Sequence, residues 1–142
     1  MRKLLKKSGT QKPNSKKKII ESLDKEFSKY IRSIGHCEKC LRGKSTKLET
    51  AHFLTRANLS IRWDKDNAVC LCQECHRWAH KNRELFRLFF SSIKHPDELE
   101  RVEKLANQKA EPASIFLMKT LLKIIRLVNS TSGRKYEVTT EY

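Results

Sequence analysis

Residues 37–80, CEKCLRGKSTKLETAHFLTRANLSIRWDKDNAVCLCQECHRWAH, contain two cysteine pairs with two residues between the partners. Cys37 and Cys40 form the first pair, and Cys72 and Cys75 form the second. Four thiolates at this spacing can close a tetrahedron around one ion, which is the arrangement of structural zinc sites. A redox dithiol is the alternative, but such a pair occurs singly, at a helix start in a thioredoxin-like context. The sequence therefore predicts a structural zinc ion held by these four cysteines.

The fifth cysteine, Cys70, lies two residues before Cys72. Free cysteine is among the most buried residue types, so Cys70 is interpreted as a small buried strand residue, with replacement of one zinc ligand as the alternative. Residues 1–18 contain no apolar segment typical of a secretory signal. We therefore expect a cytoplasmic protein and no disulfide framework, because the cytosol keeps thiols reduced.

Regions of different composition flank this stretch. Residues 1–18 carry eight basic residues and no acidic one, which predicts a basic flexible arm, either a solvated tail or an arm that contacts phosphates. Apolar residues then recur at three- and four-residue steps, which predicts an N-terminal helix over 19–35 that starts near Lys16 and stops at Gly35. Residues 36–82 form the predicted zinc-stapled core, 83–129 a helical part, and 130–142 a polar tail in which 136–140 can add a strand.

The predicted C-terminal helical part contains several helices. One continues from Cys72 to about Ile93, a second runs from Pro96 to about Lys109, and a third is capped by Ser114 and ends at Asn129. We expect their apolar residues to pack together, namely Leu85, Leu88, Phe89, Leu99, Val102, Leu105, Ile115, Leu121, Leu122, Ile125 and Val128. Phe86, Phe89 and Phe90 are interpreted as core residues in preference to a base-stacking platform.

A second group of polar residues is not needed by a structural zinc ion. His52 follows a short strand-like stretch, and Asn67 precedes the second cysteine pair. His76 and His80 are four residues apart, so a helix that begins near Cys72 would place both imidazoles on one face, one turn apart. The sequence therefore predicts a second metal site.

The charge of the chain indicates its partner. Thirty-one Lys and Arg residues outweigh 16 Asp and Glu residues, and the formal net charge is +15. Such an excess on a short chain favours a polyanion, with nucleic acid ahead of a membrane surface. No apolar run approaches the roughly 20 residues that span a bilayer, so we expect DNA as partner and no membrane.

Residues 36–82 resemble the HNH (ββα-metal) endonucleases. The resemblance is strongest to phage-type members with two zinc knuckles, each a CxxC cysteine pair, which are the NinG-like recombination nucleases. The segments that carry the resemblance are CEKC (37–40), AHFLTR (51–56), RWDKDN (62–67), LCQECH (71–76) and His80. The resemblance covers about residues 36–82, and both flanks lie outside it. It implies an α+β fold, a small ββα-metal core with flanking N- and C-terminal helices, and phosphodiester hydrolysis in DNA.

The resemblance also implies the role of each residue. His52 is the expected general base, and Asn67 positions the loop and that base. His76 and His80 are expected to hold one catalytic divalent ion, which is Mg²⁺, Mn²⁺, Ni²⁺ or Zn²⁺. Arg56 and Arg62 are suited to contact phosphates of the DNA. One subunit would nick one strand. A double-strand cut or the cleavage of a branched junction would need two sequential nicks or a homodimer, for which the flanking helices could supply the face. If the chain is phage-encoded, the expected cytoplasm is that of a bacterial host.

One position departs from the family pattern. Many HNH enzymes carry a metal ligand directly before the catalytic histidine, and this chain has Ala51 there. The ion then has fewer protein ligands and more water, or His52 is itself a ligand, or Glu49 or Asp64 contacts it. Asp64 is otherwise interpreted as a loop anchor. Trp63 and Trp78 are interpreted as covers of the zinc core in preference to base contacts.

Two other functions fit parts of the sequence. A non-catalytic zinc-stabilised module that binds DNA phosphates needs the cysteines and the charge, but it leaves the histidines unexplained. A nuclease that acts on RNA would use the same chemistry.

Overall fold

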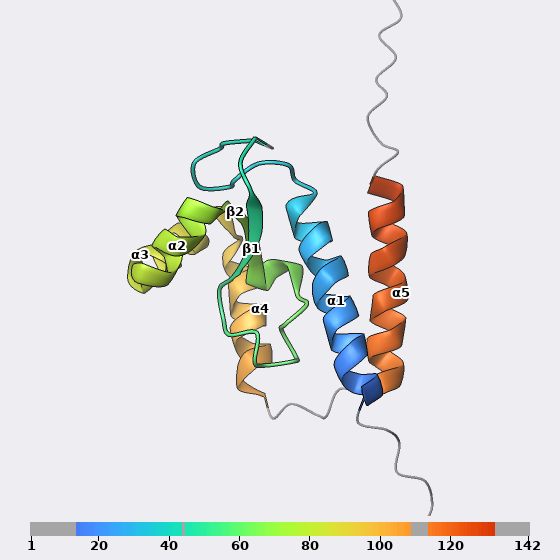
Figure 1. The fold of residues 1–142 in the computed structure, drawn as a ribbon. Helices are drawn as coiled ribbons and strands as arrows, with labels where there is room; N and C mark the ends of the chain where they lie inside the picture. The colour runs from blue at the N-terminus through green and yellow to red at the C-terminus, as the bar shows by residue number, and fades with distance from the viewer. Residues whose placement is uncertain (1–13, 44, 109–113, 133–142) are drawn as a thin grey trace, which may run out of the picture.

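The computed structural model describes residues 14–43, 45–108 and 114–132 (Figure 1). Within these ranges the chain forms five α-helices, one short 3-10 helix and a two-stranded antiparallel sheet, so the predicted α+β class is confirmed. The elements, in chain order, are α1 (Asn14–Arg32), β1 (Leu48–His52), η1 (Lys65–Asn67), β2 (Ala68–Cys72), α2 (Gln73–Lys81), α3 (Arg83–Ile93), α4 (Pro96–Asn107) and α5 (Ile115–Ser132).

The two strands form the centre of the fold. Leu48 pairs with Cys72 and His52 pairs with Ala68, so the long connection between them, residues 53–67, leaves and re-enters at the same end of the sheet. All five residues of β2 are buried. Side chains alternate along a strand, so Ala51 and His52 point to opposite faces of β1. α2 follows β2 without a loop, because the thiol of Cys72 accepts a hydrogen bond from the Cys75 amide and caps the helix.

Two apolar clusters cover the two sides of the sheet. The first surrounds the cysteines and the buried rings of Phe86 and Phe90, against which Leu99 packs. The second joins α1 to α5 and includes Leu23, Phe27, Ala68, Met118, Leu122 and Ile125. The two long helices therefore lie side by side, away from α2 and α3 (Figure 1).

The C-terminal helices do not form the single packed unit expected from the sequence. Leu85 and Leu88 are exposed, and Leu122 and Ile125 pack on α1 instead of on α3 and α4. Periodicity shows that a helix has an apolar face but does not show which partner covers it, and here α1 has a complementary face. The prediction that Phe86 and Phe90 are core residues is confirmed, and Phe89 is partly buried beside them.

Helix boundaries differ from the predictions at several points. The helix predicted from Cys72 to Ile93 is interrupted at Asn82, which leaves helical geometry and donates from its side chain to the Trp78 carbonyl. Asparagine competes in this way with the backbone hydrogen bonds of a helix. α1 ends at Arg32, and Gly35 adopts a φ of 83° in the turn that follows, as a helix-stopping glycine does.

The predicted terminal segments are only partly described. α1 begins at Asn14, so residues 14–18 are helical, and residues 1–13 of the predicted arm lie outside the described ranges. α4 ends at Asn107, and α5 extends to Ser132, beyond its predicted end. The Ser114 hydroxyl accepts a hydrogen bond from the Leu117 amide, which confirms the predicted cap. Residues 109–113 and the predicted strand at 136–140 lie outside the described ranges. None of the described helices is both long enough and apolar enough to cross a membrane.

Candidate metal centre and histidine groove

The four predicted cysteines converge at one end of the sheet. Cys37 and Cys40 lie in the loop after α1, Cys72 ends β2, and Cys75 lies in the first turn of α2. Their sulfur atoms all lie within 4.8 Å of one another. Cys37, Cys72 and Cys75 are buried, and no other group of three or more metal-ligating side chains occurs among the described residues. The cluster can hold a structural metal ion such as zinc, and its burial leaves little access for water.

Arg42 polarises this cluster from its exposed side. Its Nε donates to Cys40 Sγ at 3.3 Å, its Nη2 lies 3.8 Å from Cys72 Sγ, and it forms an ion pair with Glu74. The hydrogen bond from Arg42 is the largest influence on Cys40 and lowers the pKa of its thiol to about 6. The thiolate is the metal-binding form, so this cysteine is prepared to bind a metal at neutral pH. Burial instead raises the pKa of Cys75, which a cation at the centre would offset.

Cys70 lies outside the cluster. It is fully buried in β2, and burial raises the pKa of its thiol to about 11. Its amide donates to Glu38 Oε2 at 2.6 Å, which ties the first knuckle to the strand. The interpretation of Cys70 as a buried strand residue is confirmed.

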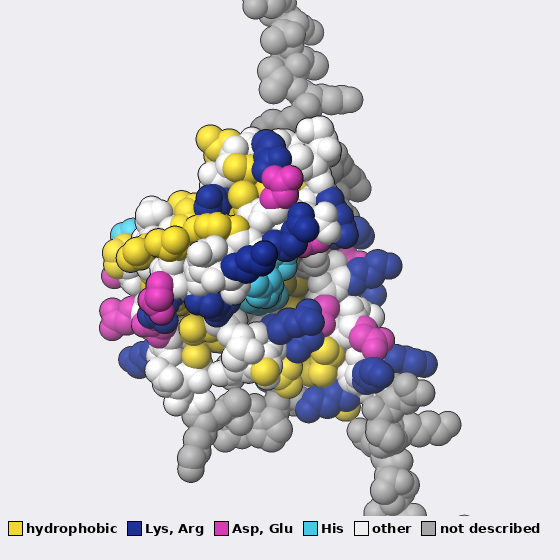
Figure 2. Space-filling model, turned by 60° about the vertical axis from the view of Figure 1, so that its left-hand side comes forward, with side chains coloured by type: hydrophobic (Ala, Val, Ile, Leu, Met, Phe, Trp, Pro, Cys, Tyr) yellow, Lys and Arg dark blue, Asp and Glu magenta, His cyan; other side chains and the backbone are white. Residues whose placement is uncertain are grey.

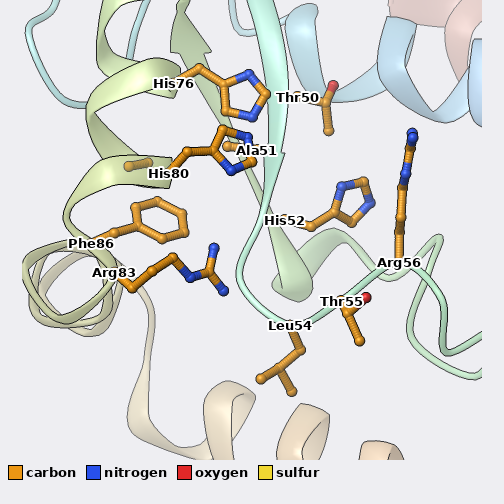
Figure 3. Close-up of a pocket in the computed structure, with 11 residues that line it drawn as sticks. Thr50, Ala51, His52, Leu54, Thr55, Arg56, His76, His80, Arg83 and Phe86 are labelled. Carbon is orange, nitrogen blue, oxygen red and sulfur yellow. The ribbon is translucent and has the colours of Figure 1, made fainter.

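A groove with a volume of about 390 Å³ contains all three predicted histidines of the site. His76 and His80 extend from α2 with their ring centroids 4.7 Å apart, and His52 lies at the end of β1 (Figure 3). Arg56 and Arg83 also line the groove, and the buried side chains of Ala51 and Phe86 form part of its apolar floor. The fold therefore brings together histidines that are 24 and 28 residues apart in sequence.

Glu49 orients His76. Its Oε2 lies 2.8 Å from His76 Nδ1, and because an ionised carboxylate only accepts, the imidazole donates. The hydrogen bond from His76 is the largest influence on Glu49 and lowers the pKa of its carboxyl. In a neutral imidazole this contact leaves the lone pair on Nε2. A carboxylate behind a metal-binding histidine is the usual partner that holds the ring in position.

His52 is held by the main chain. Its Nε2 lies 2.9 Å from the Arg62 carbonyl oxygen, which can only accept, so Nε2 carries the proton and Nδ1 keeps the lone pair. The Phe27 ring of α1 packs beside it at 6.0 Å between centroids. Burial is the main influence on His52 and lowers the pKa of its imidazole. A neutral imidazole at pH 7 is the form that accepts a proton.

Asn67 lies behind the groove and does not line it. It is fully buried, its Oδ1 accepts from the Leu54 amide at 2.8 Å, and its Nδ2 donates to the Ile61 carbonyl at 3.0 Å. These bonds connect the start and the middle of the 53–67 loop to η1. The contacts of Asn67 are those of a residue that shapes the loop after His52.

The two predicted phosphate-binding arginines have different surroundings. Arg56 is exposed and lines the groove. Arg62 does not line it, because its guanidinium donates to both carboxylate oxygens of Asp24, at 2.8 and 2.5 Å, and to the Arg56 carbonyl at 2.9 Å. Arg83 also lines the groove, and the sequence analysis did not predict it. Its spacing of three residues from His80 was the available signal.

The structure also shows the surroundings of Ala51 and of the two carboxylates considered as replacements for a metal ligand at that position. Ala51 is 1% exposed and packs in the core around the cysteines. Asp64 caps η1 and pairs through both oxygens with Arg101, so its interpretation as a loop anchor is confirmed. Of the two carboxylates considered, Glu49 is the one that contacts a predicted metal ligand.

The two tryptophans cover different cores. Trp78 packs against the cluster around the cysteines, as expected. Trp63 packs against the α1–α5 cluster instead, and its Nε1 donates to Asp24 at 2.9 Å.

No family model, no curated protein and no solved structure matches the chain. The function must therefore be inferred from the chemistry of the groove.

A second hollow continues past His52 toward α1. It has a volume of about 310 Å³ and shares Thr50, His52 and Arg56 with the histidine groove. Arg32 and Lys47 also line it. Figure 2 shows Lys and Arg side chains gathered around a histidine on this face of the molecule. Asp24 and Glu49 line the same hollow, so the histidine groove is open at one side to a surface on which three basic side chains accompany two acidic ones.

Proposed function

We propose that this chain is a metal-dependent HNH (ββα-metal) endonuclease that hydrolyses phosphodiester bonds in DNA. The single observation that carries the proposal is the groove itself, which is lined both by a neutral histidine at the end of β1 and by a histidine pair on α2. Glu49 supports the proposal, because a surface histidine pair has no need of a carboxylate partner. The resemblance of residues 36–82 to the family adds the expected role of each side chain.

In this proposal His76 and His80 hold one divalent ion. The donor set fits, because Glu49 accepts the hydrogen bond from His76 Nδ1 and so leaves Nε2 for the metal. Imidazole ligands favour Mn²⁺, Ni²⁺ or Zn²⁺ over Mg²⁺. When bound, the ion would stabilise the negative charge that builds on the phosphoryl oxygens and the leaving oxygen. Two protein ligands would leave several positions for water and phosphate, which is one of the alternatives left open by Ala51.

His52 is the general base. Its Nδ1 takes a proton from a water molecule, whose oxygen forms a bond to phosphorus while the bond from phosphorus to the leaving sugar oxygen breaks. The Arg62 carbonyl keeps Nε2 protonated and so directs the free lone pair. The lowered pKa keeps this lone pair available near pH 7.

In this proposal Arg56 and Arg83 contact phosphates of the cleaved strand. Both are exposed and both line the groove. Arg32 and Lys47 line the hollow on the α1 side, where the carboxylates of Asp24 and Glu49 already have partners, and these two cations support a backbone path across β1. Contacts of this kind position DNA without specifying a base sequence.

We propose that zinc occupies the four-cysteine cluster and acts structurally. The cluster joins the loop after α1, the end of β2 and the first turn of α2, so it fixes the helix turn that carries His76. The second candidate is a non-catalytic DNA-binding module with the same zinc. The net charge of +15 favours it equally, but it explains neither the Glu49–His76 contact nor the neutral His52.

A plasmid-relaxation assay tests the nuclease. Wild-type protein is expected to convert supercoiled DNA to open-circle or linear DNA with Mg²⁺, Mn²⁺ or Ni²⁺ and not with EDTA. His52→Ala is expected to lose about 10²- to 10⁴-fold in rate and to keep its zinc and DNA affinity. His95→Asn is the control, because His95 lies outside the groove and caps α4 through a side-chain acceptor that asparagine also offers.

Two results would contradict the proposal. Cleavage that His52→Ala retains would show that His52 is not the base. Tight DNA binding without cleavage in any of the three metals, on duplex and branched DNA, would favour the binding module. An RNA substrate cleaved in the same His52-dependent way would keep the chemistry and change the substrate.

A further inference from the structure

Arg62 connects His52 to a helix outside the segment that resembles the family. Its carbonyl oxygen accepts the hydrogen bond from His52 Nε2 at 2.9 Å. Its side chain turns to α1, where Nε and Nη2 donate to the two carboxylate oxygens of Asp24 at 2.8 and 2.5 Å. One residue therefore joins the imidazole to a carboxylate of α1.

Neighbouring groups restrict the geometry of the Asp24–Arg62 ion pair. The Arg62 side chain is 17% exposed, and Trp63 Nε1 donates to the same carboxylate at 2.9 Å. Burial raises the pKa of Asp24, but the hydrogen bonds from Arg62 and Trp63 outweigh it and lower that pKa, so the carboxylate is charged at pH 7. A two-pronged arginine–carboxylate pair restricts both partners in distance and in angle. The backbone at Arg62 is thereby fixed relative to α1.

We propose that Asp24 and Arg62 are positioning residues for His52. The ion pair fixes the Arg62 carbonyl, the carbonyl keeps the imidazole in the tautomer with the proton on Nε2, and Nδ1 is left as the proton acceptor. The use of Nδ1 in catalysis rests on the proposed nuclease function, whereas the control of the tautomer does not. α1 is then part of the functional site and not only a cover for the sheet.

The groups that face His52 decide which measurement is informative. Burial, and after it the charges of Arg56 and Arg62, lower the pKa of His52, while the carbonyl and the charge of Asp24 raise it. Phe27 contacts the ring and carries no charge. Removal of Asp24 would change several of these influences in opposite directions. The position of the proton on the ring is therefore a cleaner measure than the pKa.

The experiment is nitrogen-15 NMR of the histidine side chains in the zinc-loaded full chain, above the pKa of His52. The wild-type protein is expected to show His52 protonated on Nε2. Asp24→Ala is expected to shift His52 toward a mixture of the two tautomers. Asp24→Asn keeps one acceptor oxygen for Arg62 and Trp63 and is expected to restore part of the wild-type signal. In the relaxation assay Asp24→Ala is expected to lower the rate about 10- to 100-fold, because small displacements of a reacting group have large effects.

Glu26→Ala is the matched control on the same helix. Glu26 accepts from Asn129 Nδ2 at 2.9 Å and so joins α1 to α5, but it does not contact Arg62. It is expected to lower thermal stability without changing the His52 tautomer. If Asp24→Ala does not fold, Asp24→Asn and Arg62→Lys make the same comparison, since lysine cannot form the two-pronged contact.

The outcomes separate this inference from the proposed function. A His52 tautomer that is unchanged in the Asp24 and Arg62 variants would overturn the inference, even if the protein cleaves DNA. A change that Glu26→Ala produces equally would also overturn it. A tautomer shift confined to the Asp24 and Arg62 variants supports it, whether or not any DNA is cleaved.

Discussion

The four-cysteine cluster and the histidine groove share helix α2, yet one is closed and the other open. Cys75 and His76 are neighbours in sequence. Cys75 is 7% exposed and its sulfur joins the cluster, whereas His76 faces a groove of about 390 Å³. A helix turns about 100° per residue, so neighbours on it reach different surroundings.

The closed cluster and the open groove therefore suit different roles. A closed set of four ligands has no free position for a substrate, so a metal ion there contributes to folding. The histidines instead have an open side, where water and a ligand can approach. Glu49 accepts a hydrogen bond from His76, and the Arg62 carbonyl accepts one from His52. These bonds restrict the orientation of two imidazole rings and leave the groove open.

Removal of one cysteine tests the closed site and has the largest expected effect. Cys37→Ser is expected to lose zinc and most of the folded structure, because structural zinc contributes about 10 kcal/mol or more in small zinc domains. Zinc content and far-UV circular dichroism measure this. Cys70→Ala is the control and is expected to retain one zinc per chain, since Cys70 lies outside the cluster. Equal zinc loss in both variants would contradict the assignment.

Removal of the carboxylate behind His76 tests the open site. His76→Ala is expected to abolish Mn²⁺ or Ni²⁺ binding at the groove, and Glu49→Gln to weaken it about 10- to 100-fold. Titration calorimetry on zinc-loaded protein measures both. Glu74→Gln, in the first turn of α2 and outside the groove, is expected to bind these ions as the wild type does. Wild-type affinity in Glu49→Gln would show that the carboxylate does not orient the ligand.

Removal of the groove arginines tests the DNA path. Arg56→Ala and Arg83→Ala are each expected to weaken DNA binding several-fold and to reduce the slope of log affinity against log salt by about one. Fluorescence anisotropy across a salt series measures this. Arg101→Ala serves as the control, because Asp64 and Asp66 already hold its guanidinium. A slope that falls only in the control would place the DNA on another face.

The pH dependence of His52 is the smallest expected effect. Because its pKa in the folded protein is lowered below the ordinary value of about 6.5, cleavage is expected to keep its rate down to pH values below 6.5. The unfolded chain takes up a proton near pH 6.5 while the folded protein does not, so stability falls as pH drops through this value. The wild type should lose more stability there than His52→Gln, whose cysteines respond to acid in the same way. Denaturant unfolding between pH 5 and 8 measures this, and equal losses would contradict it.

The sequence was sufficient for local features with a strict spacing. The two CxxC pairs predicted the cluster, and helical spacing predicted that His76 and His80 lie together. It was also sufficient for the burial of Phe86 and Phe90 and for the Ser114 cap. These features depend on residues close in sequence or on a metal geometry that allows few alternatives.

The partners of individual side chains required the structure. Arg62 and Arg56 are equivalent as charges in a sequence, but in the structure Arg62 donates hydrogen bonds to a carboxylate of α1 whereas Arg56 lines the groove. The helix break at Asn82 and the packing of α5 on α1 were missed for a similar reason. An apolar face or a polar side chain has several possible partners. Which partner it contacts depends on how the whole chain packs to bury its apolar surface.

By itself, then, the sequence determined the α+β class, the zinc-type cysteine cluster, the basic character and the histidines of the groove. Only the tertiary structure decided that Glu49 stands behind His76, that Arg83 lines the groove, and that Asp24 reaches His52 through Arg62. The physical reason is range. Spacing along the chain specifies contacts within a turn or a knuckle, whereas contacts between α1, β1 and the 53–67 loop depend on how separate segments pack.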